Sequence, residues 1–301
     1  AGNAARKTSA AGTRSRTVSP VASRCGWPKL RTPRVDLRAC CCINLRPFSN
    51  ATDMIEVQNL RKTFGASGDK VAVDDISFSV KQGEVLGFLG PNGAGKSTTM
   101  RMITGYLAPD SGTAIVDGHD ITLAPEAAKA VMGYLPENAP SYPDMTVTSF
   151  LNFAAEVRGL SGKERNDAVD RSIEMCFLDP VRHQSIDTLS KGYTHRTCLA
   201  QSLLHDPKVL ILDEPTDGLD PNQKHEARQL IKRLGETKAV IFSTHILEEV
   251  DAACSRAIII DQGRIVANGT PEELKAQSKT GKLDDLFRDL TMSKTAEQEA
   301  A

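Results

Sequence analysis

The stretch Gly90-Pro91-Asn92-Gly93-Ala94-Gly95-Lys96-Ser97-Thr98 decides the fold, because it fits the pattern GxxxxGK[ST] and directly follows an apolar run at 84–89. Its glycines let successive backbone N–H groups turn inward around phosphate oxygens, and the start of the following helix adds partial positive charge. Lys96 is placed to reach the β- and γ-phosphates, and Ser97 to give its hydroxyl to Mg²⁺. The sequence therefore predicts a strand, a phosphate-binding loop and a helix in succession.

The patterns on either side of this loop predict an α/β fold. Two alternating apolar–polar segments, at 54–60 and 71–80, are typical of an antiparallel pair at a sheet edge. Continuous apolar runs predict buried strands of a mainly parallel sheet at 84–89, 209–212, 239–242 and 257–260. Helical periodicity follows several of them, at 96–104, 223–234 and 247–253.

A helical insertion is predicted between Glu137 and Leu204. Strand patterns stop there, and helical patterns occupy 148–158, 163–176 and 196–204. We therefore expect one domain over 54–292, with a helical subdomain at about 137–204 and a flexible tail at 293–301.

A second candidate site element follows the apolar run at 209–212, which ends in two carboxylates, Asp213 and Glu214. Ligands bind at the carboxyl ends of strands in open α/β sheets, so Asp213 is expected to hold Mg²⁺ through water. Glu214 is expected to accept a proton from an attacking water. Paired acids are often only a solvated strand end, but the phosphate loop upstream favours the catalytic interpretation.

Composition argues against a membrane-spanning protein and against a nucleic-acid-binding protein. The 301 residues are 40% hydrophobic and 25% charged, and no apolar run approaches the ~18–20 residues of a transmembrane helix. Ten basic and two acidic residues precede or include residue 53, so the remainder carries 27 basic and 36 acidic residues. An acidic body of this kind argues against a nucleic-acid partner.

The segment 1–53 is basic, rich in Ser, Ala and Pro, and lacks periodicity, so we expect it to be disordered. It begins without Met, whereas Met54 opens a patterned strand, which favours upstream sequence translated from a misplaced start; an organellar transit peptide is the alternative. The run Cys40-Cys41-Cys42 leaves a lipidation or metal site open. The three scattered cysteines after Met54 suggest a reducing compartment.

The chain resembles the nucleotide-binding subunit of an ATP-binding cassette (ABC) transporter over about residues 54–291. The resemblance depends on five motifs in a fixed order: the Walker-A loop at 90–98, a signature-like Leu189-Ser190-Lys191-Gly192-Tyr193, the Walker-B strand at 209–214, a D-loop-like Asp217-Gly218-Leu219-Asp220, and Ser243-Thr244-His245. It implies a P-loop NTPase fold of the ABC type, with a mainly parallel sheet, an antiparallel β edge subdomain and the helical insertion.

The resemblance also assigns roles. Phe64 stands where an aromatic ring stacks on adenine, although a place in the core of the edge strand is the alternative. His245 stands where the family's histidine contacts the γ-phosphate, and Ser190 and Gly192 where the signature binds the γ-phosphate held by a second subunit, with Ser190 capping the next helix. One signature and one Walker-A loop in the chain imply a head-to-tail dimer, with a homodimer expected, that closes on two ATP.

Three departures from the family pattern stand out. Lys191 replaces the first glycine of the usual signature and Tyr193 its glutamine; Ser190 and Gly192 remain for the phosphate contact, and Lys191 adds a cation beside it. Glu137 occupies the Q-loop position, where it is expected to join Ser97 and Asp213 as an Mg²⁺ ligand while repelling the triphosphate. Thr194-His195-Arg196 is a less usual continuation of the signature helix. These variants resemble bacterial exporter-type cassettes of the gliding-motility and multidrug subgroup.

The resemblance implies an ATPase subunit that powers a separate integral membrane permease, from the cytoplasmic face of the cell membrane. The segment 138–145, with Tyr142 as an exposed anchor, is the expected contact with the permease, and an ordinary proline-rich turn is the alternative. Two other functions stay open: a non-transport cassette and a nucleotide-dependent regulator without turnover. Only 92 positions separate Ser97 from Leu189, which leaves no room for the coiled coils of DNA-repair relatives.

Overall fold

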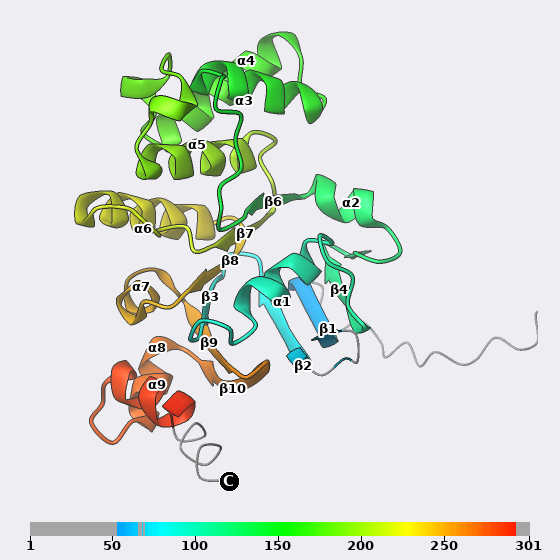
Figure 1. Cartoon of the computed structure of the whole chain (residues 1–301), viewed down its shortest axis with the longest axis vertical. Helices are drawn as coiled ribbons and strands as arrows, with labels where there is room; N and C mark the ends of the chain where they lie inside the picture. Colours follow the sequence, from blue (N-terminus) through cyan, green and yellow to red (C-terminus); the bar gives the residue numbers. More distant parts are fainter. Residues whose placement is uncertain (1–52, 66–67, 69, 293–301) are drawn as a thin grey trace, which may run out of the picture. The chain divides into compact units, whose positions relative to one another are not determined.

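The computed structural model of the chain describes residues 53–65, 68 and 70–292. The predicted basic segment 1–53, apart from its last residue, and the predicted tail 293–301 lie outside this range. Within it, strands and helices alternate along the chain as the sequence predicts (Figure 1).

Four strands near the start of the described chain form an antiparallel sheet. In spatial order they are β2 (Lys70–Lys81), β1 (Asp53–Phe64), β4 (Ser111–Val116) and β5 (His119–Asp120). The first two are the predicted edge hairpin, and their register places Phe64 opposite Lys70. The hairpin register thus fixes the position of the candidate adenine-stacking ring.

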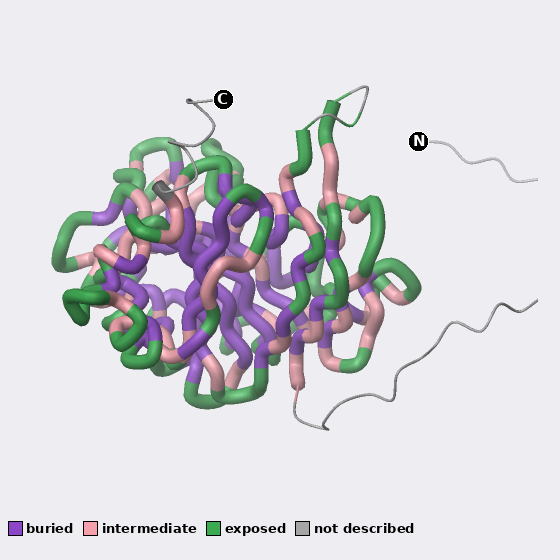
Figure 2. Tube along the Cα trace, turned by 90° about the horizontal axis from the view of Figure 1, so that it is seen from below, coloured by how far each residue is buried: buried purple, intermediate pink, exposed green. Residues whose placement is uncertain are grey.

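The second sheet has six strands and carries the candidate site. In spatial order they are β10 (Arg264–Gly269), β9 (Arg256–Asp261), β3 (Val85–Leu89), β8 (Ala239–Thr244), β7 (Val209–Asp213) and β6 (Met132–Leu135). All neighbours pair in parallel except β10 with β9. Every residue of β3, β7 and β8 is buried, which explains their unbroken apolar sequences (Figure 2).

The register brings the carboxyl ends of four strands to one edge of this sheet. Leu89 pairs with Thr244, the last residues of β3 and β8. Asp213 pairs with Ser243, and Leu135 at the end of β6 pairs with Leu212. The segments that follow these strands, which contain the predicted site residues, therefore start side by side.

Helices cover both faces of the six-stranded sheet. They are α1 (Lys96–Ile103), α2 (Pro125–Ala130), α3 (Val147–Val157), α4 (Gly162–Met175), α5 (Lys191–Leu203), α6 (Pro221–Gly235), α7 (Leu247–Ala253), α8 (Pro271–Gln277) and α9 (Leu283–Met292), with 3-10 turns at Asp179–Val181 and Ile186–Thr188. Helices α3, α4 and α5 gather in one group beyond α6 (Figure 1). None of the helices in the described residues is long and apolar enough to cross a membrane.

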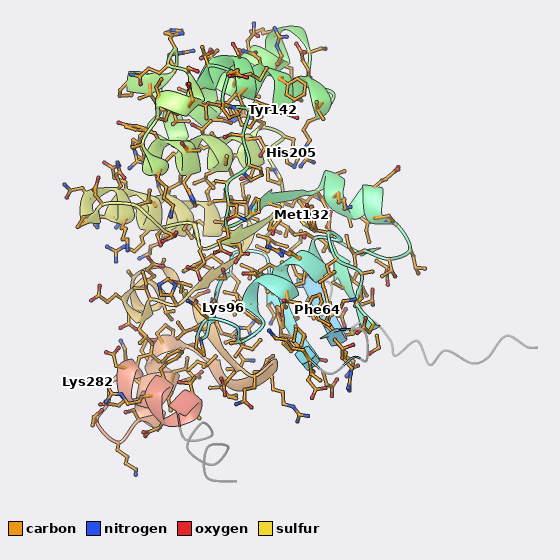
Figure 3. The ribbon with its side chains drawn as sticks, viewed as in Figure 1. Phe64, Lys96, Met132, Tyr142, His205 and Lys282 are labelled. Atoms are coloured by element: carbon orange, nitrogen blue, oxygen red, sulfur yellow. The ribbon has the colours of Figure 1, made fainter. Side chains whose placement is uncertain are left out.

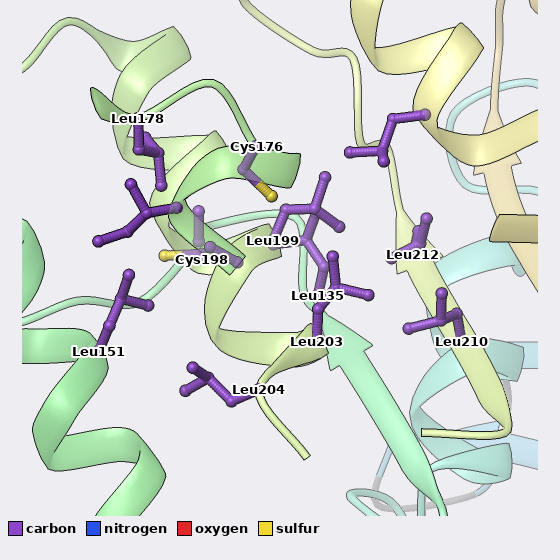
Figure 4. Close-up of a cluster of buried hydrophobic side chains, with 14 of the residues drawn as sticks. Leu135, Leu151, Cys176, Leu178, Cys198, Leu199, Leu203, Leu204, Leu210 and Leu212 are labelled. Carbon is purple, nitrogen blue, oxygen red and sulfur yellow. The ribbon is translucent and has the colours of Figure 1, made fainter. Parts of the chain in front are cut away.

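Three clusters of buried side chains hold these layers together. One lies between the two sheets and includes the apolar face of α1. Another joins α3, α4 and α5 to β6, β7 and α6, and its leucines interdigitate in Figure 4. The third packs α7, α8 and α9 against β3 and β9. The group of helices is therefore attached to the sheet directly through a shared core.

Two helices begin earlier than their periodicity predicts, because a capping residue defines each start. Helix α5 begins at Lys191 rather than at 196, with the predicted cap Ser190 accepting a hydrogen bond from Tyr193 N at 3.4 Å. Helix α6 begins at Pro221 rather than at 223, because Asp220 forms a capping box with Gln223.

Candidate functional site

The phosphate loop is shaped by its packing against two strands. Gly95 has φ +107°, and a Cβ added to it would lie 2.4 Å from the carbonyl oxygen of Ala72 on β2. A Cβ on Gly90 would lie 2.5 Å from the carbonyl oxygen of Ile260 on β9. Only glycine fits at these two positions, so the motif's glycines place the loop against both sheets.

Lys96, the first residue of α1, is buried inside the loop (Figure 3). Its Nζ donates hydrogen bonds to Gly90 O at 2.7 Å and Pro91 O at 3.2 Å, and lies 3.7 Å from Glu214 Oε1. Burial lowers the pKa of Lys96, and the carboxylates of Glu214 and Asp213 oppose that shift. A buried ammonium group therefore lies within the loop, beside two of the loop's own carbonyl oxygens.

Asp213 forms the polar floor of the site. It is fully buried, and its Oδ1 accepts hydrogen bonds from Ser243 Oγ at 2.5 Å and from Ser97 Oγ at 3.1 Å. No described residue donates a hydrogen bond to Asp213 Oδ2. A buried carboxylate oxygen without a partner, next to a serine hydroxyl, fits the oxygen ligands that Mg²⁺ prefers.

Glu214 and His245 meet across the ends of two neighbouring strands. His245 Nδ1 lies 2.8 Å from Glu214 Oε2, and Glu214 N donates to Ser243 Oγ at 3.0 Å. An ionised carboxylate can only accept a hydrogen bond, so this contact requires a proton on Nδ1 of His245 when Glu214 is ionised. Glu214 also has φ +52°, in the left-handed region, and its Oε1 lies 3.7 Å from Lys96 Nζ.

Seven of the eleven predicted nucleotide-contacting residues line one cavity of about 320 Å³, whereas Gly90, Pro91, Ala94 and Asp213 do not line it. It is lined by Phe64, Lys70, Ala72, Asn92, Gly93, Gly95, Lys96, Ser97, Thr98, Glu137 and Glu214. Phe64 is 42% exposed there, so the alternative interpretation of its side chain as a core residue is wrong. The centroid of its ring lies 6.0 Å from Lys62 Nζ.

The sequence patterns missed three residues of this site. Lys70 and Ala72 line the cavity from β2, and only the register of the hairpin brings them there. Ser243 links Asp213 to the backbone of Glu214; it belongs to the sequence motif of His245, but that motif predicted no role for Ser243 itself. A strand-end serine after a buried run was the available signal, but serines at such positions are common.

The signature-like residues lie outside this cavity. Ser190 caps α5, and Asp220 caps α6, where its Oδ1 accepts from Asn222 N and Gln223 N at 2.9 Å each. Gly192 packs closely against α6, since an added Cβ would lie 2.5 Å from Gln223 Oε1. The structure of one chain therefore does not bring the signature to its own phosphate loop.

Lys191 is held by a neighbouring acid. Its Nζ lies 2.6 Å from Asp217 Oδ2, and the hydrogen bond from Lys191 lowers the pKa of Asp217. Both residues line a second cavity, of about 410 Å³, which Glu137 also lines. Glu137 thus borders both the phosphate-side cavity and the signature-side cavity.

Comparison with known proteins agrees with this arrangement. The family model described as "ABC transporter" matches residues 73–217. The probable multidrug ABC transporter ATP-binding protein YbhF of Escherichia coli (strain K12) is 39% identical over 233 residues, which cover 77% of this chain and 40% of that protein. The chain therefore spans less than half the length of that relative.

A relative of more similar extent is the linearmycin resistance ATP-binding protein LnrL of Bacillus subtilis (strain 168). It is 39% identical over 222 residues, which cover 73% of this chain and 70% of that protein. The solved structure of an ATP binding subunit of an ABC transporter superposes with a TM-score of 0.70 and 29% identity, over 79% of this chain and 99% of that one. The α/β fold with its antiparallel and helical parts is thereby confirmed, and the chain belongs to the ABC transporter family, among its ATP-binding proteins.

Proposed function

We propose that this chain binds ATP with Mg²⁺ in the cavity beside Lys96 and hydrolyses it. The observation that carries the proposal is that Lys96, Ser97 and Glu214 line one cavity, while His245 contacts Glu214 and Asp213 contacts Ser97 from the ends of neighbouring strands. Phe64 would stack on the adenine, and the loop at 90–98 would hold the phosphates. Bound Mg²⁺, held by Ser97, Asp213 and Glu137, would supply charge neutralisation at the β- and γ-phosphates.

Glu214 is proposed to accept the proton of the attacking water. Its Oε2 is hydrogen-bonded to His245 Nδ1 and its Oε1 lies near Lys96 Nζ, so the carboxylate is held between two groups that orient it. His245 would hold the water and the γ-phosphate in line, while Lys96 would leave the carbonyl oxygens of the loop for phosphate oxygens. Most of the catalysis would come from positioning and charge stabilisation.

The active form is proposed to be a head-to-tail homodimer. Ser190, Lys191 and Gly192 lie outside their own chain's cavity, so they would serve the nucleotide held by a second copy, with Asp220 at the contact between the two. Residues 54–292 would form one cassette with its helical subdomain at 137–204. Two such cassettes would drive a separate integral membrane permease from the cytoplasmic face of the membrane, with export as the direction.

The permease is proposed to dock at a groove of about 440 Å³ between the segment after β6 and α3. Three exposed apolar side chains line it: Tyr142, Phe153 and Val157 are 55%, 40% and 71% exposed. Tyr142 stacks edge-on against Phe153 with ring centroids 5.6 Å apart. Exposed apolar side chains along a groove fit a helix of the permease that presents an apolar face to them.

The test of hydrolysis uses the purified full chain with Glu214→Gln, Lys96→Ala and the exposed control Glu236→Gln. Glu214→Gln should still bind ATP but lose turnover by at least about 100-fold, because the base is lost. Lys96→Ala should lose nucleotide binding. Appreciable turnover by Glu214→Gln would contradict the role of Glu214, and a wild-type chain that binds ATP without hydrolysing it would favour the nucleotide-dependent regulator.

The test of transport identifies proteins that co-purify with Glu214→Gln from host membranes in Mg-ATP, by mass spectrometry. A polytopic membrane protein that is lost when Tyr142 and Val157 are both changed to Ser would support the permease and its docking groove. Recovery of soluble partners alone would contradict transport and leave the ATP site unaffected.

A further inference from the structure

Glu249 is a buried acid that the mechanism above does not use. It lies in the first turn of α7 and is 1% exposed. Its Oε2 accepts a hydrogen bond from Thr244 Oγ1 at 2.6 Å, and its Oε1 accepts one from Thr216 Oγ1. Both threonines are themselves buried, at 2% and 3% exposure. A carboxylate is costly to bury, so a pair of charge-assisted hydrogen bonds points to a specific task.

The two threonines belong to the two segments that carry the hydrolytic pair. Thr216 lies two residues after Glu214, in the connection from β7 to α6. Thr244 is the last residue of β8 and directly precedes His245, and its Oγ1 also accepts from Ile246 N at 3.0 Å. Each oxygen of Glu249 therefore holds one side of the contact between Glu214 and His245.

Ser243 makes a second set of hydrogen bonds between the two segments. Ser243 Oγ donates to Asp213 Oδ1 and accepts from Glu214 N, so it fixes the residues just before and at the base. The hydrogen bonds of Ser243 end at Glu214 N and do not reach the chain after Glu214. Glu249 joins that part of the chain to the end of β8, because it contacts both Thr216 and Thr244.

We propose that Glu249 is a positioning residue of the hydrolytic site, whose carboxylate bridges Thr216 and Thr244 and thereby holds Glu214 and His245 in contact. The inference depends on the ATPase activity proposed above for its kinetic consequence. Its structural consequence, the placement of His245, does not depend on that activity.

Loss of either threonine hydroxyl breaks the link that Glu249 makes between Thr216 and Thr244, so each threonine can be tested separately by kinetics. Thr216→Val and Thr244→Val should each lower kcat by about 10-fold through misplacement of the base, with KM for ATP within about 2-fold of wild type. The double variant should lose no more than about 2-fold beyond the worse single variant. Glu249→Gln should keep kcat within about 3-fold, because an amide can accept from one hydroxyl and donate to the other.

The matched control is Thr148→Val, which removes a threonine hydroxyl that donates to Arg182 O in the group of helices, away from this site. If a valine variant fails to fold because the carboxylate is left unpaired, Glu249→Leu removes the charge together with both bonds and should show the same kcat loss. Multiplying losses in the double variant, or unchanged kcat in both singles, would overturn the bridge.

The readout that needs no turnover is the NMR signal of the His245 ring in histidine-labelled protein, assigned with His245→Gln. This signal should shift in Thr216→Val and Thr244→Val and stay unchanged in Thr148→Val. A wild-type chain without ATPase activity would contradict the proposed function while the His245 signal still tests the bridge. An unshifted His245 signal in both valine variants would overturn the inference even if the wild type hydrolyses ATP.

Discussion

Replacing Asp213 with Asn should make the protein more stable without ligand and less stable with it. The carboxylate is fully buried, two serine hydroxyls share its Oδ1, and no described residue donates to its Oδ2. A buried charge with an unpaired oxygen costs about 1–3 kcal/mol, whereas a neutral amide of the same shape costs less to bury. Part of this gain is offset because Lys96 loses a nearby negative charge.

The expected size follows from this balance. A net gain of about 1–2 kcal/mol in the free energy of unfolding raises Tm by about 2–8 °C for a protein of this size. ATP with Mg²⁺ at about 100 times its Kd should stabilise the wild type by about 2.7 kcal/mol. Asp213→Asn should lose the Mg²⁺-dependent part of that stabilisation, because the orphaned oxygen is gone. Asp213→Asn should therefore have the higher Tm without ligand, and the wild type the higher Tm with Mg-ATP.

The assay is differential scanning fluorimetry on wild type, Asp213→Asn and the exposed control Asp144→Asn, each without ligand, with ATP and EDTA, and with Mg-ATP. The control should follow the wild type in all three conditions. A ligand-free Tm for Asp213→Asn below that of the wild type would refute the reasoning, because it would mean that neighbours satisfy the charge. A full Mg²⁺-dependent shift in the variant would refute the assignment of Asp213 to the metal.

Three further predictions concern other parts of the molecule. Burial, more than the nearby Arg158, lowers the pKa of His205 to about 4, so between about pH 6.5 and 4 the unfolded chain binds more protons than the folded one. The free energy of unfolding should therefore fall by about 1–2 kcal/mol as pH drops through this window. His205→Gln should reduce this pH dependence in melting curves. Asp220→Ala removes the capping box of α6 and should lower the free energy of unfolding by about 1 kcal/mol in urea titrations, with the m-value unchanged. Gly95→Ala should weaken ATP binding by about 10–100-fold in a fluorescent-nucleotide titration, since the new Cβ meets a backbone oxygen; Gly93→Ala, with φ +84° but open space around its Cβ, should cost distinctly less, and equal losses would contradict the role of the clash.

The parts of the fold that could be predicted are those in which a residue pattern follows directly from binding chemistry or from burial. The loop at 90–98 could be predicted because glycine, lysine and serine have fixed spacing between a strand and a helix. The strands β3, β7, β8 and β9 could be predicted because burial on both faces requires continuous apolar runs. Strands β4, β5, β6 and β10 were not predicted, because they lack a continuous apolar run and are stabilised by their neighbours in the sheet rather than by their own pattern.

The site was predicted less completely than the fold, since several of its contacts arise only from pairing across the sheet. Asp213, Glu214 and His245 stand out as polar residues after apolar runs. Ser243 and Glu249 do not, because their roles depend on which strand lies next to which. The connections from β7 and β8 are far apart in the chain, and no local pattern reports that they meet.

The position of β8 between β3 and β7 has a consequence for how the protein is made. During synthesis the strand before the phosphate loop and the strand that ends in Asp213 both emerge before β8, yet they are not hydrogen-bonded to each other in the finished sheet. In the finished sheet β3 and β7 lie about two strand spacings of 4.8 Å apart, so hydrogen bonding of both into one sheet requires residues 239–244 between them. A chain halted before Ala239 therefore has the loop at 90–98 and the strand that ends in Asp213, but lacks both His245 and the strand that joins the two segments.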